Sequence, residues 1–172
     1  MVPQPHSIHI SKLRAISGFS LVEILAVMLV LVALAVVAIP KFVELSSASR
    51  NSALEVINGA AQSANALVKA KVYGGADTRE VPSRDDLLDV DMTGDGNYDT
   101  RLKWGWLDNT DIHKWINLSD DFGRNTQGID KTFIGYDLDN NGTVINDRCY
   151  FLYTQASGAG RSPGYEVVAD GC

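Results

Sequence analysis

Apolar residues are distributed unevenly along this chain of 172 residues. A continuous apolar run extends from Leu21 to Ile39 and is interrupted by a single charge, at Glu23. At the helical rise of about 1.5 Å per residue, this run reaches just under the roughly 30 Å of a bilayer's hydrocarbon core. It therefore predicts a helix that buries itself in lipid or against other copies of the chain.

Beyond Lys41 the apolar positions become one-sided, as they do in an amphipathic helix. The pattern ends at Gly74-Gly75, a helix stop. Together the two segments predict one helix of about 55 residues, roughly 80 Å long, with a kink or soft point at Pro40. The expected apolar face consists of Phe42, Leu45, Ala53, Val56, Ala60, Leu67 and Val68.

The remainder of the chain has a β-like pattern. Residues 77–98 are charged and rich in turn formers, which predicts a long surface loop, whereas apolar runs at 101–106, 132–138, 149–154 and 165–169 predict strands. A helix followed by strands predicts an α+β fold, with an antiparallel sheet packed on the amphipathic half of the helix. A helical turn at 111–118 is left open. Trp104, Trp106 and Trp115 are expected in the core, with a sugar-stacking surface as the alternative.

The net charge and the two cysteines limit what kind of protein this chain can be. The formal net charge is −6, so general nucleic-acid binding is not expected, because phosphate contacts require a basic face. Cys149 and Cys172 are either buried free thiols or a disulfide. The disulfide is favoured, since it would tie down a final residue that otherwise frays, and it would indicate an oxidising compartment.

The N-terminal segment differs from an ordinary secretory signal. Lys12 and Arg14 precede the apolar run without acidic residues, which predicts that the body of the protein is delivered out of the cytoplasm. The small residue stands before the run, at Gly18, and not after it, although an uncleaved signal anchor remains an alternative. Cleavage after Gly18 would create an amino group on Phe19, and a neighbouring copy would then offer that ammonium to Glu23.

The segment Gly18–Glu23 (GFSLVE), followed by the apolar run and Pro40, resembles the class III leader and stem of type IV pilins and pseudopilins. The resemblance implies cleavage between Gly18 and Phe19 by a prepilin peptidase, methylation of the Phe19 amine, and contact of Glu23 with that amine in an adjacent subunit. It also favours Pro40 as a soft point between packed stems. The leader, the cysteine pair and the segment 104–106 are most similar to the mannose-sensitive haemagglutinin (MSHA) pilins.

The resemblance predicts four segments: a cleaved leader at 1–18, a transmembrane and filament-core helix at 19–40, an amphipathic helix at 41–75, and a head at 76–172. It implies a precursor in the inner membrane of a Gram-negative bacterium and then an extracellular pilus that serves adhesion and biofilm formation. The implied partners are other copies of the chain, the prepilin peptidase, an assembly platform and a secretin. The alternative is a pseudopilin of a type II secretion system.

Two acidic loops resemble EF-hand calcium loops, because oxygen-bearing side chains alternate and a glycine stands at position six. Neither loop has the expected Glu at position twelve, where Leu102 and Arg148 stand instead, although Asp147 is a substitute in the second. The alternative is a pair of Asx turns. The candidate ligands are Asp91, Thr93, Asp95, Asn97 and Asp99 in the first loop, and Asp137, Asp139 and Asn141 in the second.

No enzymatic activity is expected. Two of the three histidines lie in the leader, so the processed chain would keep only His113, which leaves no histidine-based metal cluster or catalytic triad. No cofactor is required by this interpretation, and calcium is the one ligand for which the sequence offers candidate residues.

Overall fold

The structure, a computed structural model, describes residues 18–172, so the predicted leader falls outside the described residues except for Gly18. The chain forms two compact units, one ending at Phe42 and the other comprising Val43–Cys172. Helix α1 extends over Leu21–Tyr73, continues through Pro40 and ends directly before Gly74. The predicted long helix and its stop are confirmed.

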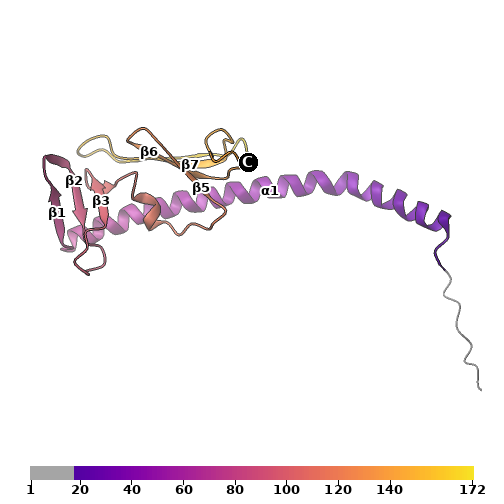
Figure 1. The fold of residues 1–172 in the computed structure, drawn as a ribbon, viewed down its shortest axis with the longest axis horizontal. Coiled ribbons are helices and arrows are strands. Elements are labelled where there is room, and N and C mark those ends of the chain that lie inside the picture. The colour runs from indigo at the N-terminus through magenta and orange to yellow at the C-terminus, as the bar shows by residue number, and fades with distance from the viewer. Residues whose placement is uncertain (1–17) are drawn as a thin grey trace, which may run out of the picture. The chain divides into compact units, whose positions relative to one another are not determined.

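Antiparallel strands follow the helix, so the α+β class is also confirmed (Figure 1). They form two four-stranded sheets and not one, each with its strands in chain order. The first sheet contains β1 (Thr78–Val81), β2 (Arg84–Val90), β3 (Thr100–Lys103) and β4 (Trp106–Leu107). The second contains β5 (Gly123–Gln127), β6 (Lys131–Gly135), β7 (Tyr150–Thr154) and β8 (Gly164–Val168). A 3₁₀ turn, η1 (Ile112–Trp115), lies between them, where the sequence left a helical turn open.

Both sheets pack on the second half of α1, but the predicted face of the helix is mostly wrong. The buried positions recur every three or four residues and are Leu54, Ile57, Ala61, Ala64, Asn65 and Val68. Of the predicted set, Val68 is buried, Ala53 and Ala60 are half-buried, and Phe42, Leu45, Val56 and Leu67 are exposed. The helix is apolar on two sides, and the sheets cover only one of them.

The predicted surface loop at 77–98 is confirmed from residue 91 to 98 but is wrong over its first part, where β1 and β2 form a hairpin. Their outward positions carry charges that pair across the strands: Arg79 lies opposite Asp89, and Asp89 lies opposite Arg101 on β3. The inward positions Leu88 and Val90 pack against the core. The charges on the outward side of β2 made the segment look like a loop, although its inward side carries the apolar residues of a normal strand.

The three tryptophans lie at the edge of the core and not within it. Trp104 is 37% exposed, at the tip of the β3–β4 hairpin, while Trp106 and Trp115 are half-buried. The fully buried aromatic side chains are instead Phe151 and Tyr153 on β7. The prediction that all three tryptophans are core residues is therefore wrong: Trp104 is exposed, and Trp106 and Trp115 are only half-buried.

A buried polar side chain joins the helix to both sheets. The Asn65 side-chain oxygen accepts a hydrogen bond from the Leu107 amide in β4, at 2.8 Å. Its nitrogen donates to the hydroxyl groups of Tyr165, at 2.9 Å, and Tyr153, at 3.4 Å. Tyr153 in turn donates to the Leu107 carbonyl, at 2.6 Å. Since buried polar groups are costly unless they are paired, this set fixes one register of helix against sheets.

Candidate functional site: the exposed N-terminal half of α1

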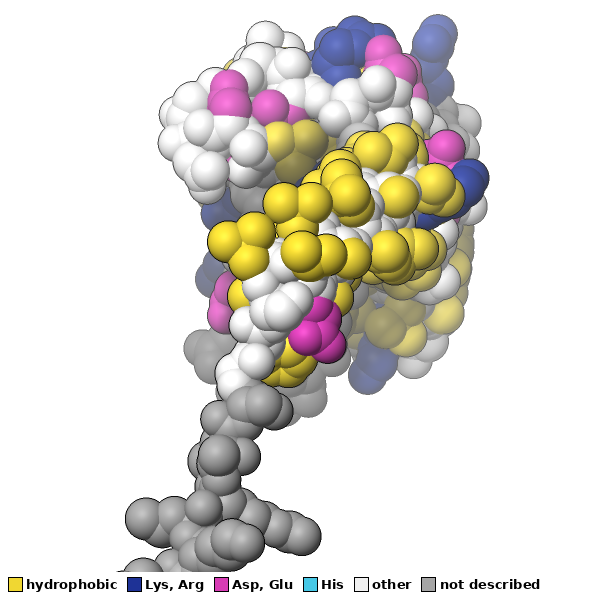
Figure 2. Space-filling model, turned by 90° about the vertical axis from the view of Figure 1, so that its right-hand side faces the viewer, with side chains coloured by type: hydrophobic (Ala, Val, Ile, Leu, Met, Phe, Trp, Pro, Cys, Tyr) yellow, Lys and Arg dark blue, Asp and Glu magenta, His cyan; other side chains and the backbone are white. Residues whose placement is uncertain are grey.

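The first half of α1 presents its apolar side chains without cover. Figure 2 looks onto this half of the helix, and hydrophobic side chains occupy most of its visible surface. Their exposed fractions range from 50% at Ile24 to 78% at Leu21. Apolar surface of this extent is stable only when lipid or protein covers it. Among the residues that the structure describes, α1 is the helix long and apolar enough to cross a membrane.

The start of α1 is fixed by a cap that the sequence analysis did not single out. The Glu23 amide donates to the Ser20 hydroxyl oxygen at 3.2 Å, and the Ile24 amide donates to the Ser20 carbonyl at 3.1 Å. Ser20 is thus the N-cap, and Glu23 stands three residues later, the spacing of a capping box. The Ser-x-x-Glu pattern was visible in the sequence and would have identified this role.

The predicted cleavage point lies just before the cap. Gly18 and Phe19 are both exposed and precede the helix, and Phe19 exposes 79% of its side chain. A side chain at Gly18 would meet no atom within 4 Å among the described residues. The peptide bond between Gly18 and Phe19 is therefore open to a protein that reads an extended segment there. The Glu23 carboxylate is exposed on the same end of the helix.

The two cysteines form the predicted disulfide. The sulfur atoms of Cys149 and Cys172 are 2.09 Å apart, and Cys149 is fully buried at the start of β7. Arg50 on α1 donates from Nη1 to the Cys172 carbonyl oxygen at 3.0 Å, and its guanidinium lies 5.8 Å from the centre of the Tyr136 ring. The end of the chain is thus tied covalently to the second sheet and by a hydrogen bond to the helix.

The first acidic loop folds around the Asp91 carboxylate. That carboxylate accepts hydrogen bonds from the amides of Thr93, Gly94 and Gly96, at 2.7–3.1 Å, and these lower the pKa of Asp91. Gly96 has a φ of +85°, which favours glycine and gives the sharp turn predicted for position six. Asp91 and Thr93 are drawn together in an Asx-type turn. Asp95, Asn97 and Asp99 are exposed around it, and the Asp95 carboxylate accepts the Asn97 amide.

The second acidic loop brings carboxylates together. Oxygen atoms of Asp137, Asp139 and Asp147 all lie within 4.8 Å of one another. Asp147 accepts the Leu138 amide at 3.1 Å, which holds it beside the loop, while Asn141 donates to Asp139 at 2.8 Å. Three carboxylate oxygens in this arrangement suit a hard cation such as Ca²⁺. The amides of Asn141 and Gly142 also donate to Asp137, as in an Asx-type turn, so the calcium site stays a prediction for both loops.

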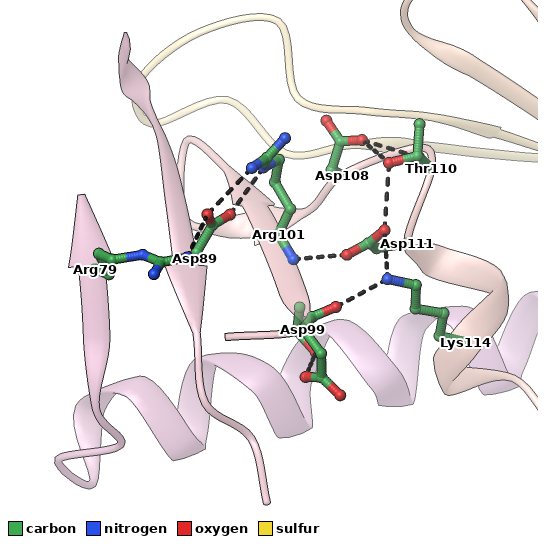
Figure 3. A network of polar contacts seen from close by, with 9 residues as sticks. Arg79, Asp89, Asp99, Arg101, Asp108, Thr110, Asp111 and Lys114 are labelled. Carbon is green, nitrogen blue, oxygen red and sulfur yellow. Dashed lines mark hydrogen bonds and ion pairs between the residues drawn. The ribbon is translucent and has the colours of Figure 1, made fainter. Parts of the chain in front are cut away.

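A polar network on the first sheet had no signal in the sequence (Figure 3). The Arg101 guanidinium on β3 binds both oxygens of Asp89, at 2.8 and 3.1 Å, and it lowers the pKa of that buried carboxyl. The Arg101 amide donates to Asp111 at 2.7 Å, and Lys114 lies 3.0 Å from the same carboxylate. Thr110 donates to Asp108 at 2.6 Å. Residues far apart in the chain meet here, so only the fold reveals them.

The network holds its charges in fixed pairs. Buried carboxylates at Asp89 and Asp111 each have a cationic partner and hydrogen bonds, which is the condition under which burial of a charge is tolerated. The geometry fits a structural role, in which the loop at 108–111 and the turn η1 are fastened to the outer face of β3.

The chain was compared with protein-family models, with curated proteins and with solved structures, and none of them matches it.

Proposed function

We propose that this chain is a self-assembling filament subunit of the type IV pilin class, most similar to the MSHA pilins, and that it has no enzymatic activity. The observation that carries the proposal is the uncovered apolar half of α1, which bears one carboxylate, Glu23, close to its capped start. A monomer of this kind requires lipid before assembly and other copies of itself afterwards.

The second half of α1 supports the same conclusion. Val56 is 72% exposed and Leu67 is 50% exposed, on positions of the helix that the sheets leave uncovered. Isolated exposed apolar residues are common, but these belong to a helix whose opposite side is fully packed. Packing of several such helices around a common axis would bury both halves of α1.

Glu23 would set the register between subunits. Cleavage after Gly18 by a prepilin peptidase would leave an ammonium group on Phe19, which the peptidase would then methylate. In an apolar assembly an unpaired carboxylate is expensive, at about 2.5–3.5 kcal/mol in the centre of a bilayer. Pairing Glu23 of one copy with the Phe19 ammonium of the next removes that penalty, and Pro40 would give the packed stems a point of flexibility.

The route implied by this function begins in the inner membrane of a Gram-negative bacterium and ends on the cell surface. An assembly platform and a secretin would be the machinery, and the polymer would serve adhesion and biofilm formation. The disulfide supports this part of the proposal, since such bonds persist in oxidising compartments.

A pseudopilin of a type II secretion system is the second candidate. The cluster of Asp137, Asp139 and Asp147 favours it, because the major pseudopilins, which the N-terminal segment also resembles, often use calcium where pilins have a terminal disulfide. The two candidates differ in product: a pilus is a long filament that shearing releases from cells, and a pseudopilus is a short periplasmic one.

The deciding experiment is the intact mass and N-terminal sequence of the protein sheared from cells. We expect a chain that begins at Phe19 and carries one extra methyl group. Its mass should also be lower by two hydrogens than that of the reduced form, because of the Cys149–Cys172 disulfide. A chain found only in the membrane fraction and beginning at Met1 would support a signal anchor and overturn the filament proposal. Processed protein without sheared filaments would favour the pseudopilin.

A substitution isolates the charge of Glu23 from its position in the cap. Glu23→Gln keeps a residue that suits a capping box but removes the carboxylate. We expect processed protein that accumulates in the membrane while sheared filaments fall at least about ten-fold. Glu55→Gln, on an exposed position of the same helix, is the matched control and should leave filament yield unchanged.

A further inference from the structure

A groove of about 730 Å³ lies on the first sheet, in the unit Val43–Cys172. The β1–β2 turn forms one part of it, the β3–β4 turn another, and residues 159–160 a third. Its lining combines one aromatic ring, Trp104, with a charged rim. The rim consists of Glu80, Arg84, Asp85 and Asp86.

Trp104 stands at a position that disfavours it. It is the first of the two turn residues between Lys103 and Trp106, which are paired in the ladder, and its φ is +54°. Such turns favour Asn or Gly, and an L-residue in this region costs roughly 1–2 kcal/mol. Burial of the rest of the side chain gains about 25 cal/mol per Å² of apolar surface, which is at least of the same order as this cost. Trp104 also lines the groove, and the 37% of it that is exposed is open to a ligand.

The groove carries excess negative charge. Its lining holds three carboxylates and one guanidinium, a formal charge of −2. Arg84 is occupied by both oxygens of Asp86, at 2.8 and 2.9 Å, and Lys103 lies 3.7 Å from the same carboxylate. Among the described residues, Glu80 and Asp85 have no hydrogen-bond or ion-pair partner, so their oxygens are available to a ligand.

We propose that this groove binds a primary alkylammonium group, of the kind carried by a lysine side chain of a partner. Tryptophan is the ring that attracts cations best, and this attraction reaches about 2 kcal/mol when the cation is desolvated. The same chemistry occurs next to the groove, where the Lys69 ammonium lies 3.2 Å from the centre of the Trp106 ring. This site is separate from the apolar half of α1 and goes beyond the proposed function.

The charged rim selects among ligands. Glu80 and Asp85 accept hydrogen bonds, which a primary ammonium donates and a quaternary one does not. Their charge repels anionic sugars and phosphates. An uncharged sugar also stacks on an aromatic ring and donates hydroxyl hydrogen bonds to carboxylates, so the positive charge of the ligand is what distinguishes the two ligand classes.

The test uses the full chain in neutral-detergent micelles and a blocked Gly-Lys-Gly peptide. Binding is followed through the indole N–H resonance of Trp104, assigned by its absence in Trp104→Asn. The peptide with an Nζ-acetylated lysine is the matched ligand, because it keeps the chain length and loses the charge. We expect the lysine peptide to shift the Trp104 resonance saturably and the acetylated peptide to bind at least about five-fold more weakly.

Two variants complete the test. Trp104→Asn relieves the turn but loses the buried part of the ring, so its fold is checked by circular dichroism, and the folded variant should lose lysine binding. The double variant Glu80→Gln/Asp85→Asn should keep the Trp104 ring and bind the lysine peptide at least about five-fold more weakly than the unmodified protein does. Its binding should also depend less on salt concentration than that of the unmodified protein. Equal binding of the two peptides, or binding that survives in both variants, would overturn the proposal. Saturable binding of a neutral hexose oligomer that ignores the double variant would assign the groove to sugars instead.

Discussion

The Asn65 contacts allow a quantitative prediction for the variant Asn65→Ala. Truncation removes the acceptor of the Leu107 amide and leaves that buried N–H unpaired, which costs about 1–3 kcal/mol. It also removes the donor to the hydroxyl groups of Tyr165 and Tyr153, at about 1 kcal/mol for the shorter contact. Alanine recovers about 0.7 kcal/mol of helix propensity. The expected net loss is about 2 kcal/mol.

That loss corresponds to a fall in melting temperature of about 7 °C, for a unit whose size gives roughly 3–4 °C per kcal/mol. The assay is near-ultraviolet circular dichroism of the full chain in micelles, because all three tryptophans lie in the unit Val43–Cys172. Asn58→Ala is the matched control: Asn58 is on the same helix, and its side chain contacts only Glu55 and Gln62 near the surface.

The control gains the same propensity without losing a buried contact, so its melting temperature should stay within about 2 °C of the unmodified protein. A comparable fall in both variants would mean that helix geometry and not the Asn65 hydrogen bonds sets the stability. The reasoning would also fail if Asn65→Ala melted unchanged while the Leu107 amide remained protected from hydrogen exchange.

Three further predictions address other contacts. Since Arg101 lowers the pKa of Asp89 in the folded state, stability from this pair is present above the unfolded pKa of about 3.9 and is lost as the pH falls through the folded value. Asp89→Asn should therefore flatten the acid limb of a melting-temperature profile, and an unchanged limb would contradict this. Replacing Cys172 by Ser should lower stability by about 3 kcal/mol in chemical denaturation and leave Cys149 reactive to thiol reagents only after unfolding. Added calcium should raise the melting temperature of the unmodified protein but not of Asp147→Asn, and identical melts in calcium and in chelator would remove the calcium prediction.

The helix and its stop were predictable because their signals are local: a continuous apolar run and a glycine pair. The face that α1 buries was not, since the helix is apolar on two sides and only the sheets decide which side is covered. Val56 and Leu67 fit the period as well as Leu54 does, yet they remain exposed. The apolar pattern of the sequence is therefore wider than the face that this one chain buries, and a second apolar side of α1 stays exposed.

For α1 the sequence has more apolar positions than the fold buries, whereas two of the strands have too few apolar positions to be predicted. β2 was not predicted as a strand because its outward positions are charged. Those charges are favourable only in the folded sheet, where Arg79 and Arg101 flank Asp89. β5 (Gly123–Gln127) offers no apolar residue at all and is held as an edge strand by its pairing with β6. Of the candidate sites, the disulfide was predictable from two residues and Asp147 from its place near position twelve of the second loop, whereas the approach of the three carboxylates to within 4.8 Å of one another required the fold.

The strand order of the two sheets has a consequence for how the protein acquires its structure. In each sheet every strand pairs with the strand that precedes it along the chain, so all partners are available as soon as they appear. A chain whose residues after the apolar run emerge into a new compartment in sequence order would complete the sheet of β1–β4 before β5 emerges, and the second half of α1 would already be present as a surface for it. Vectorial folding of this kind needs no late strand to insert between earlier ones, which shortens the time during which unpaired strand edges are open to aggregation.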